Sequence, residues 1–173
     1  MNTSEQCHLL RRIRWLVGLF IAGLVLSGAT AIPLETEAAW LAKVTGAHQR
    51  ADAPSSTTPP EWAIWLCRVE VALRETNLKH PFISYGGDWL AFGHFIIALV
   101  FVGAWRDPVR NRWLFDFGLL ACALVVPYAL ICGGFRGIPL WWRLIDCSFG
   151  VVGAIPLWIA RRAVERIAAL TTD

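Results

Sequence analysis

The sequence predicts an all-α fold, an integral membrane four-helix bundle with an amphipathic extracytoplasmic helix between spans 1 and 2. Three observations predict this class. The 173 residues are 56% hydrophobic and only 17% charged, whereas soluble domains are about a quarter charged. The remaining charges leave four long, predominantly apolar runs, each long enough for a helix that crosses a bilayer. Arginines and tryptophans border these runs, as is typical of residues at membrane interfaces.

The first predicted span covers residues 15–33 and follows a polar cytoplasmic N-terminus, residues 1–14. The basic start, the apolar core and Ala29-Thr30-Ala31 also fit a cleaved signal peptide. An apolar run of about nineteen residues is long for a signal core, so we expect a retained helix. One stripe of small residues should let another helix approach closely: Gly18, Ala22, Val25 and Ala29.

An extracytoplasmic segment, residues 34–87, follows the first span. We expect a short helix over 34–44, a loop over 46–60 and a longer helix over about 61–75. Thr58-Pro59-Pro60-Glu61 resembles a capping box at the start of the longer helix. Its charged residues prevent this helix from spanning, so it lies either flat on the membrane or over the bundle as a lid. Its apolar residues recur at spacings of three and four: Trp62, Trp65, Leu66, Val69 and Leu73.

The rest of the chain contains three further spans. Asp88 is a natural N-cap for the second span, and Arg112 should pair with Asp116, one turn later, at the start of the third. The tail is expected to continue as helix. In order, the predicted segments are 88–105, the second span; 106–112, a cytoplasmic loop; 113–133, the third span; 134–139, an extracytoplasmic loop; 140–158, the fourth span; and 159–173, a cytoplasmic tail.

The orientation follows from the arginines, because basic residues concentrate on the cytoplasmic side of a membrane. Both termini are therefore expected inside, in the cytoplasmic (inner) membrane of a bacterium. The net charge of +3 is assigned to topology, and no nucleic-acid partner is expected. Three arginine clusters share one side of a four-span chain: Arg11, Arg12 and Arg14; Arg106, Arg110 and Arg112; Arg161, Arg162 and Arg166.

The sequence offers little support for metal or cofactor chemistry, and none is expected. The five cysteines lack zinc-type spacing, although Cys67 and Cys132 both fall on the predicted oxidising side, where they could pair. His94 is the only histidine in a predicted span, which argues against a haem held by two histidines. His-Glu-x-x-His, Gly-x-Ser-x-Gly and P-loop motifs do not occur.

Several polar side chains fall inside the spans or at their outer ends, where an ionisable group is costly and usually faces protein or water. His94 and Asp146 each lie roughly 9 Å into a helix that runs from outside to inside, so their depths are similar. Small residues flank both of them on faces that should pack against other helices. His94 has Gly87, Ala91 and Ala98 on its face, and Asp146 has Arg143, Gly150 and Gly153.

Two hypotheses account for these residues. The functional one is an outward-facing pocket in which arginines hold an anionic head group or phosphate and a His–Asp pair moves a proton. The structural one is an i,i+3 pair between Arg143 and Asp146, with His94 in one interhelical hydrogen bond. The pocket would be built from Asp88, His94, Tyr128, Arg136, Arg143 and Asp146.

Three blocks of the chain carry a resemblance to known proteins: Tyr85-Gly-Gly-Asp-Trp-Leu-Ala-Phe-Gly-His94, Arg106-Asp-Pro-Val-Arg-Asn111 and Arg136-Gly-Ile-Pro-Leu-Trp-Trp-Arg-Leu-Ile-Asp-Cys-Ser-Phe-Gly150. They resemble a group of uncharacterised bacterial four-span integral membrane proteins, which implies no activity. The order Asp, His, Arg and then Asp before a Gly-x-x-Gly helix is similar to VanZ-like proteins, which are linked to glycopeptide-antibiotic resistance. The Asp88–His94 spacing is longer than in that family, and its Glu and Gln have no counterpart near residues 129–134.

The sequence leaves two functions open. The favoured one is an accessory or assembly protein that lies in the lipid bilayer and associates with another membrane protein or with copies of itself. The alternative is a transporter or enzyme that handles a lipid or an envelope precursor through the outer pocket, with an anionic lipid as a possible ligand class. No catalytic activity is assigned.

Overall fold

The computed structural model describes residues 3–52 and 58–172, and within these ranges it contains helices and no strand. The predicted all-helical class is therefore confirmed. Four helices are long and apolar enough to cross a membrane. They are α1 (Thr3–Ala31), α5 (Tyr85–Arg106), α6 (Trp113–Phe135) and α7 (Leu140–Thr172).

Shorter elements occupy the segment between α1 and α5: α2 (Leu34–Thr45), α3 (Ala47–Ala51), α4 (Glu61–Lys79) and the 3₁₀ turn η1 (Pro81–Ile83). Gly46 ends α2 with φ +65°, and its N–H donates to the carbonyls of Ala42 and Lys43. Glycine reaches this left-handed conformation without a steric penalty. The predicted loop over 46–60 thus contains a helix, and its residues 53–57 lie outside the described part.

The chain folds as two compact units. The first combines residues 1–24 with residues 96–173, and the second comprises residues 25–95. Helix α1 is divided between the units after residue 24, and helix α5 is divided after residue 95. Each unit is described separately below.

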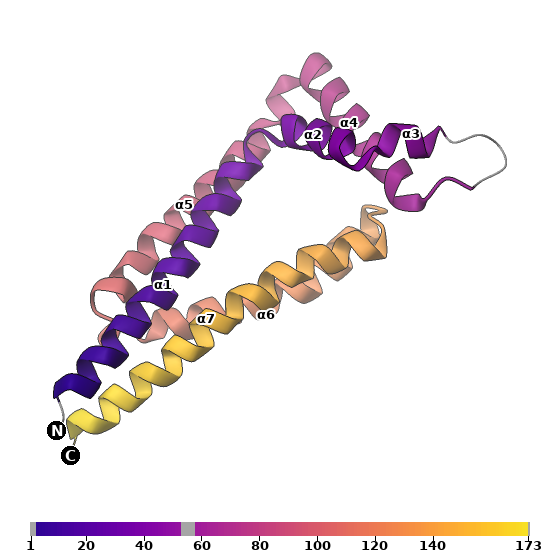
Figure 1. Ribbon diagram of the computed structural model, residues 1–173. Coiled ribbons are helices and arrows are strands. Elements are labelled where there is room, and N and C mark those ends of the chain that lie inside the picture. The colour runs from indigo at the N-terminus through magenta and orange to yellow at the C-terminus, as the bar shows by residue number, and fades with distance from the viewer. Residues whose placement is uncertain (1–2, 53–57, 173) are drawn as a thin grey trace. The chain divides into compact units, whose positions relative to one another are not determined.

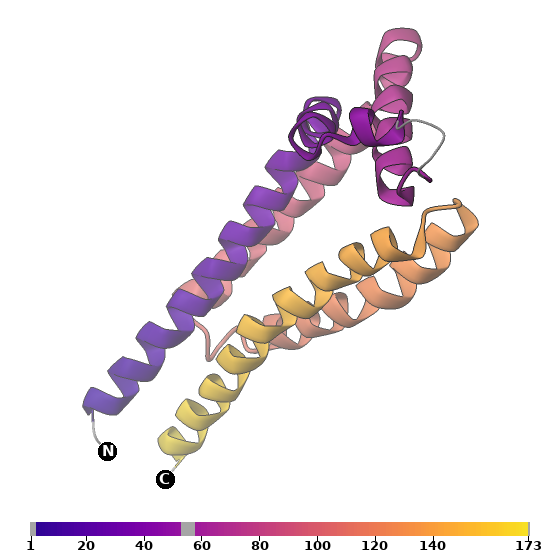
Figure 2. The same cartoon turned by 45° about the vertical axis from the view of Figure 1, so that its right-hand side comes forward.

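In the first unit, α6 and α7 form an antiparallel hairpin, and the two helices lie side by side in both views (Figures 1 and 2). The turn between them is a Schellman motif, in which Ile138 N–H donates to Gly133 O at 2.9 Å and Gly137 N–H donates to Gly134 O at 3.1 Å. Gly137 has φ +68°, the left-handed conformation that this motif requires. The last carbonyls of α6 are thereby paired, and the chain reverses directly into α7.

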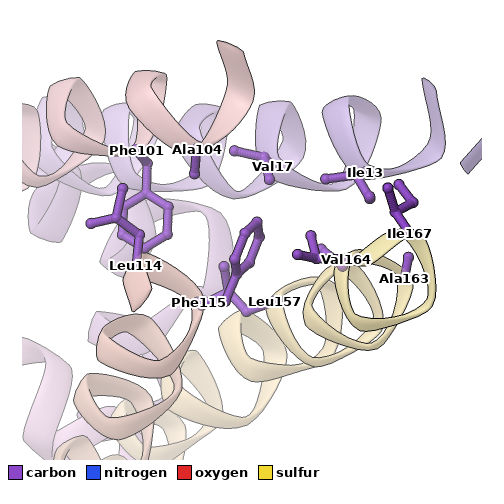
Figure 3. Close-up of a cluster of buried hydrophobic side chains, with 11 residues drawn as sticks. Ile13, Val17, Phe101, Ala104, Leu114, Phe115, Leu157, Ala163, Val164 and Ile167 are labelled. Carbon is purple, nitrogen blue, oxygen red and sulfur yellow. The ribbon is translucent and has the colours of Figure 1, made fainter. Parts of the chain in front are cut away.

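A cluster of buried apolar side chains joins all four long helices within the first unit. Figure 3 shows Ile13 and Val17 of α1 facing Val164 and Ile167 of α7. The ring of Phe115 from α6 lies between Val17 and Leu157. Because α7 buries this face beyond residue 158, the predicted tail is a continuation of that helix. The cluster comprises Ile13, Val17, Phe101, Ala104, Leu114, Phe115, Leu157, Ala160, Ala163, Val164 and Ile167.

In the second unit, α4 packs against α2 and α3. Ala63 and Leu66 of α4 are buried, and the predicted apolar face around them is less exposed than the face with Ile64 and Arg68. Part of this face is therefore covered by neighbouring short helices. The amphipathic helix at a membrane surface stays a prediction.

Two predicted helix starts are wrong. The N-cap of α4 is Pro60, and no side chain caps it, so the capping box around Thr58 does not form. Helix α5 begins at Tyr85, so Asp88 lies in its first turn and not at the N-cap. The reason is the turn η1, after which Gly87 N–H already donates to Ser84 O at 2.8 Å. A carboxylate in the first turn still interacts favourably with the helix dipole.

In the second unit, α1 and α5 approach closely through small residues. A Cβ built at Gly28 would lie 3.0 Å from both the Ala91 carbonyl oxygen and His94 Cβ. A Cβ at Gly87 would lie 3.3 Å from the Ala31 carbonyl oxygen. The prediction that the face around His94 packs against another helix is therefore confirmed.

The stripe predicted on α1 is wrong. Ala22, Val25 and Ala29 are exposed, whereas Gly28 is buried. The contact face of α1 runs instead through Ile13 and Val17, because these larger apolar side chains enter the buried cluster.

Candidate functional site

The six residues of the predicted pocket are distributed over both units. Asp88 and His94 belong to the second unit, on α5. The other four belong to the first unit: Tyr128 on α6, Arg136 at its C-cap, and Arg143 and Asp146 on α7. Neither unit assembles the pocket by itself, so the complete pocket stays a prediction.

Arg143 connects α7 to the end of α6. Its Nη1 donates a hydrogen bond to the Leu130 carbonyl oxygen at 3.0 Å. A Cβ at Gly133 would lie 2.6 Å from Arg143 Cδ, so the glycine provides the space that the arginine stem occupies. The negative end of the α6 dipole favours a cation at this position. Arg143 Nε is buried and has no hydrogen-bond partner among the described residues.

The other three polar residues of the first unit do not converge on Arg143. The expected pair between Arg143 and Asp146 is absent from the ion pairs of the described residues, because the guanidinium turns toward the α6 carbonyl instead. Tyr128 is 73% exposed, and Arg136 is exposed at the end of α6. Asp146 is half-buried.

His94 is held within its own helix. Its Nδ1 lies 2.8 Å from the Leu90 carbonyl oxygen. Because a carbonyl oxygen only accepts, Nδ1 carries the proton, and in the neutral ring Nε2 is left as an acceptor. The interhelical hydrogen bond expected for His94 is thus replaced by one within α5. Asp88 is exposed.

Asp116 pairs with a residue far along the chain. The sequence predicts a pair with Arg112, but the structure places Arg161 of α7 against the Asp116 carboxylate. Arg161 also contacts Glu165, one turn further on. The Arg161 guanidinium thus lies between the carboxylates of Asp116 and Glu165 and joins α6 to α7. The two carboxylates offset its positive charge.

A thiol, an imidazole and a carboxylate come together in the second unit, which the sequence did not predict. His48 Nε2 lies 2.8 Å from Glu70 Oε2, and His48 Nδ1 lies 3.5 Å from Cys67 Sγ. This order of groups is the one used by nucleophilic triads. Burial, followed by the charges of Glu70 and Asp52, raises the pKa of the Cys67 thiol. The thiol is therefore kept protonated, and the cluster serves to join α3 to α4.

The cysteines provide no covalent link. All five are free thiols, so the possible Cys67–Cys132 disulfide is not formed. Among the described residues, no three side chains of His, Cys, Asp or Glu come together as ligands for a metal ion.

We expect Cys67 to react slowly with iodoacetamide near pH 8, because its raised pKa leaves less of the reactive thiolate. Glu70→Gln removes a negative charge that contributes to this shift, so the pH midpoint of alkylation should fall and the rate at pH 8 should rise about twofold or more. Mass spectrometry of the peptide that carries Cys67 measures the rate. Glu75→Gln, on the same helix, is the matched control. An equal rate change in both variants would show that the charge of Glu70 does not contribute specifically to the raised pKa of Cys67.

Cavities on the α6–α7 hairpin and between α1 and α7 lie in the described part of the first unit. One, of about 410 Å³, lies on the α6–α7 hairpin and is lined by apolar residues around Cys122, Gly150 and Trp158. The other, of about 160 Å³, lies between α1 and α7 and is lined by three arginines together with apolar residues. None of the six residues of the predicted pocket lines either cavity.

The four long apolar helices are typical of a multi-pass helical membrane protein, because such helices pair every backbone group within the segment that crosses the lipid. Comparison of the chain with models of protein families, with curated proteins and with solved structures gave no match. The resemblances seen in the sequence therefore stay predictions.

Proposed function

We propose that this protein is a small accessory or assembly protein of the bacterial inner membrane, which associates with another membrane protein or with a second copy of itself. The proposal rests on the observation that polar side chains of the long helices bind backbone carbonyl groups within the helix bundle. Arg143 donates to Leu130 O on the neighbouring helix, and His94 donates to Leu90 O within its own helix. Cys147 Sγ lies 3.8 Å from Val126 O. Arg143 and Cys147 join α7 to α6, His94 is held within α5, and none of the three lines either cavity.

The proposed topology places both termini in the cytoplasm. The arginine clusters near the start of α1, after α5 and along the end of α7 support it, since basic residues remain on the cytoplasmic side. The short helices α2, α3 and α4 then lie outside the cytoplasm.

A second candidate function is the handling of an anionic lipid or envelope precursor, by transport or by catalysis. One observation favours it. Arg143 Nε is buried without a hydrogen-bond partner in the described chain, and an unpaired buried donor costs about 1–3 kcal/mol. An anionic oxygen at this end of the α6–α7 hairpin would satisfy it.

Native mass spectrometry of the protein, extracted gently from its own membrane, separates the two functions. The accessory function predicts a stoichiometric protein partner or homo-oligomer. It also predicts that Arg143→Ala lowers the thermal stability of the assembly without releasing a small molecule. Retention of a small anionic molecule that Arg143→Ala releases, while an Arg110→Ala control outside the predicted pocket retains it, would favour the second function and contradict the first.

A further inference from the structure

The cavity between the start of α1 and the end of α7 has a distinct composition. Seven residues line it: Leu9, Arg12, Trp158, Ile159, Arg162, Ala163 and Arg166. They include three arginines and no carboxylate. We call these residues the arginine groove. All of them belong to the first unit, where Ile13 of α1 packs toward Val164 and Ile167 of α7 beside the groove (Figure 3).

The positive charge of the groove is not neutralised. No ion pair of the described residues involves Arg12, Arg162 or Arg166. Asp116 and Glu165 of the same unit both contact Arg161 and not the arginines of the groove. The three guanidinium groups of the groove therefore remain available to an anion.

One of these arginines is oriented before any ligand arrives. The guanidinium of Arg162 lies over the ring of Trp158, with its central carbon 4.0 Å from the ring centroid. Stacking holds the plane of the guanidinium but leaves its N–H edge free. That edge is suited to bidentate hydrogen bonding with a phosphate.

The apolar part of the groove matches a lipid rather than a soluble anion. Leu9 and Ile159 are half-buried, and Ala163 is 6% exposed, so they form a floor beside the cations. The uncharged run of α7 ends at Ala160, directly before Arg161 and Arg162. With Trp158 at the same level, this position is typical of the boundary between acyl chains and head groups.

We propose that the arginine groove binds the phosphate of an anionic phospholipid. The part of the acyl chains nearest the glycerol packs against Leu9, Ile159 and Ala163. Each arginine close to an anionic lipid surface strengthens binding about fivefold, so together they suffice to select an anionic lipid over a zwitterionic one. The proposal holds for either function considered above, because it involves none of the residues of the predicted outer pocket.

The test is a lipid titration of the purified full-length protein followed by native mass spectrometry. Phosphatidylglycerol and phosphatidylcholine with the same acyl chains are compared. We expect the first phosphatidylglycerol to bind with a Kd at least about tenfold lower than that of phosphatidylcholine. The variant Arg12→Gln/Arg162→Gln/Arg166→Gln should reduce this difference to about twofold or less.

Two further variants separate a specific site from a general effect of charge. Arg106→Gln/Arg110→Gln/Arg112→Gln removes the same charge outside the groove and should leave the preference unchanged. Arg162→Lys keeps the charge but loses the bidentate edge, and should lose about threefold in affinity. The proposal is overturned if both triple variants lose the preference equally or if the groove variant retains it.

Two more outcomes are decisive. If soluble glycerol phosphate displaces phosphatidylglycerol, the groove binds a free phosphate and the lipid assignment is wrong. All three arginines are exposed, so the groove variant should unfold at the same temperature as the wild type. If it does not, the single variant Arg166→Gln, compared with Arg110→Gln, gives the same test with a smaller change.

Discussion

Replacing Gly150 by leucine is expected to open the α6–α7 hairpin and to lower the free energy of unfolding by about 3 kcal/mol, near the upper end of typical overpacking effects. A Cβ at this position would lie 2.5 Å from the Cys122 carbonyl oxygen and 3.3 Å from Val125 Cβ. The first of these atoms belongs to the backbone of α6 and cannot rotate away. The helices must therefore separate to admit any side chain.

Unfolding in mixed detergent micelles, followed by circular dichroism, measures this change. Gly23→Leu in α1 is the matched control, because a Cβ at Gly23 meets no atom within 4 Å. A leucine there should be neutral or stabilise by up to about 1 kcal/mol, since it forms helix more readily than glycine. Equal destabilisation by both substitutions would show that helix propensity in detergent, and not the contact with α6, determines the result.

Other glycines of the hairpin also allow α6 and α7 to come into close contact. A Cβ at Gly118 would lie 2.6 Å from Leu157 Cδ1, and a Cβ at Gly133 would lie 2.6 Å from Arg143 Cδ. Gly118, Gly133 and Gly150 thus admit a partner group near both ends and the middle of the contact. Between helices in lipid there is no hydrophobic driving force, so close packing has to supply the association energy. The hairpin is consequently sensitive to small additions of volume.

The four long helices were predictable because a predominantly apolar run of about twenty residues has few alternatives to a membrane-spanning helix. Their ends were less predictable. Helix α5 begins at Tyr85 because the hydrogen bonds that follow η1 lead directly into its first turn, and the sequence around Asp88 did not show this. Helix α7 extends to Thr172 because its buried face continues past the arginines.

The pairing of polar side chains was the least predictable feature. Helical periodicity shows which residues share a face, but it does not give the register between two helices. Local spacing therefore predicts a pair between Asp116 and Arg112, although Asp116 pairs with Arg161, which is 45 positions away. His48 and Glu70 are 22 positions apart and separated by a loop, so no local pattern connected them. The arginine groove, formed by the two ends of the chain, was missed for the same reason.

Replacing Phe115 by alanine is expected to lower the free energy of unfolding by about 3–4 kcal/mol. Its side chain is 0% exposed and lies within the buried cluster that joins the long helices of the first unit. Figure 3 shows the ring among Leu157, Val164 and Val17. Truncation would leave a cavity, and the surrounding helices can move only partly into it. The arginine groove should weaken as well, because the same cluster holds α1 beside α7.

Phe117→Ala provides the matched control for this prediction. The two phenylalanines are two positions apart on α6, but Phe117 is 44% exposed. In a membrane its exposed part faces acyl chains in both the folded and the unfolded state, so its removal should cost about 1 kcal/mol or less. The same unfolding experiment compares the two variants. If both lose equal stability, the cluster around Phe115 does not hold the helices together, and if neither loses stability, α6 does not pack through this face.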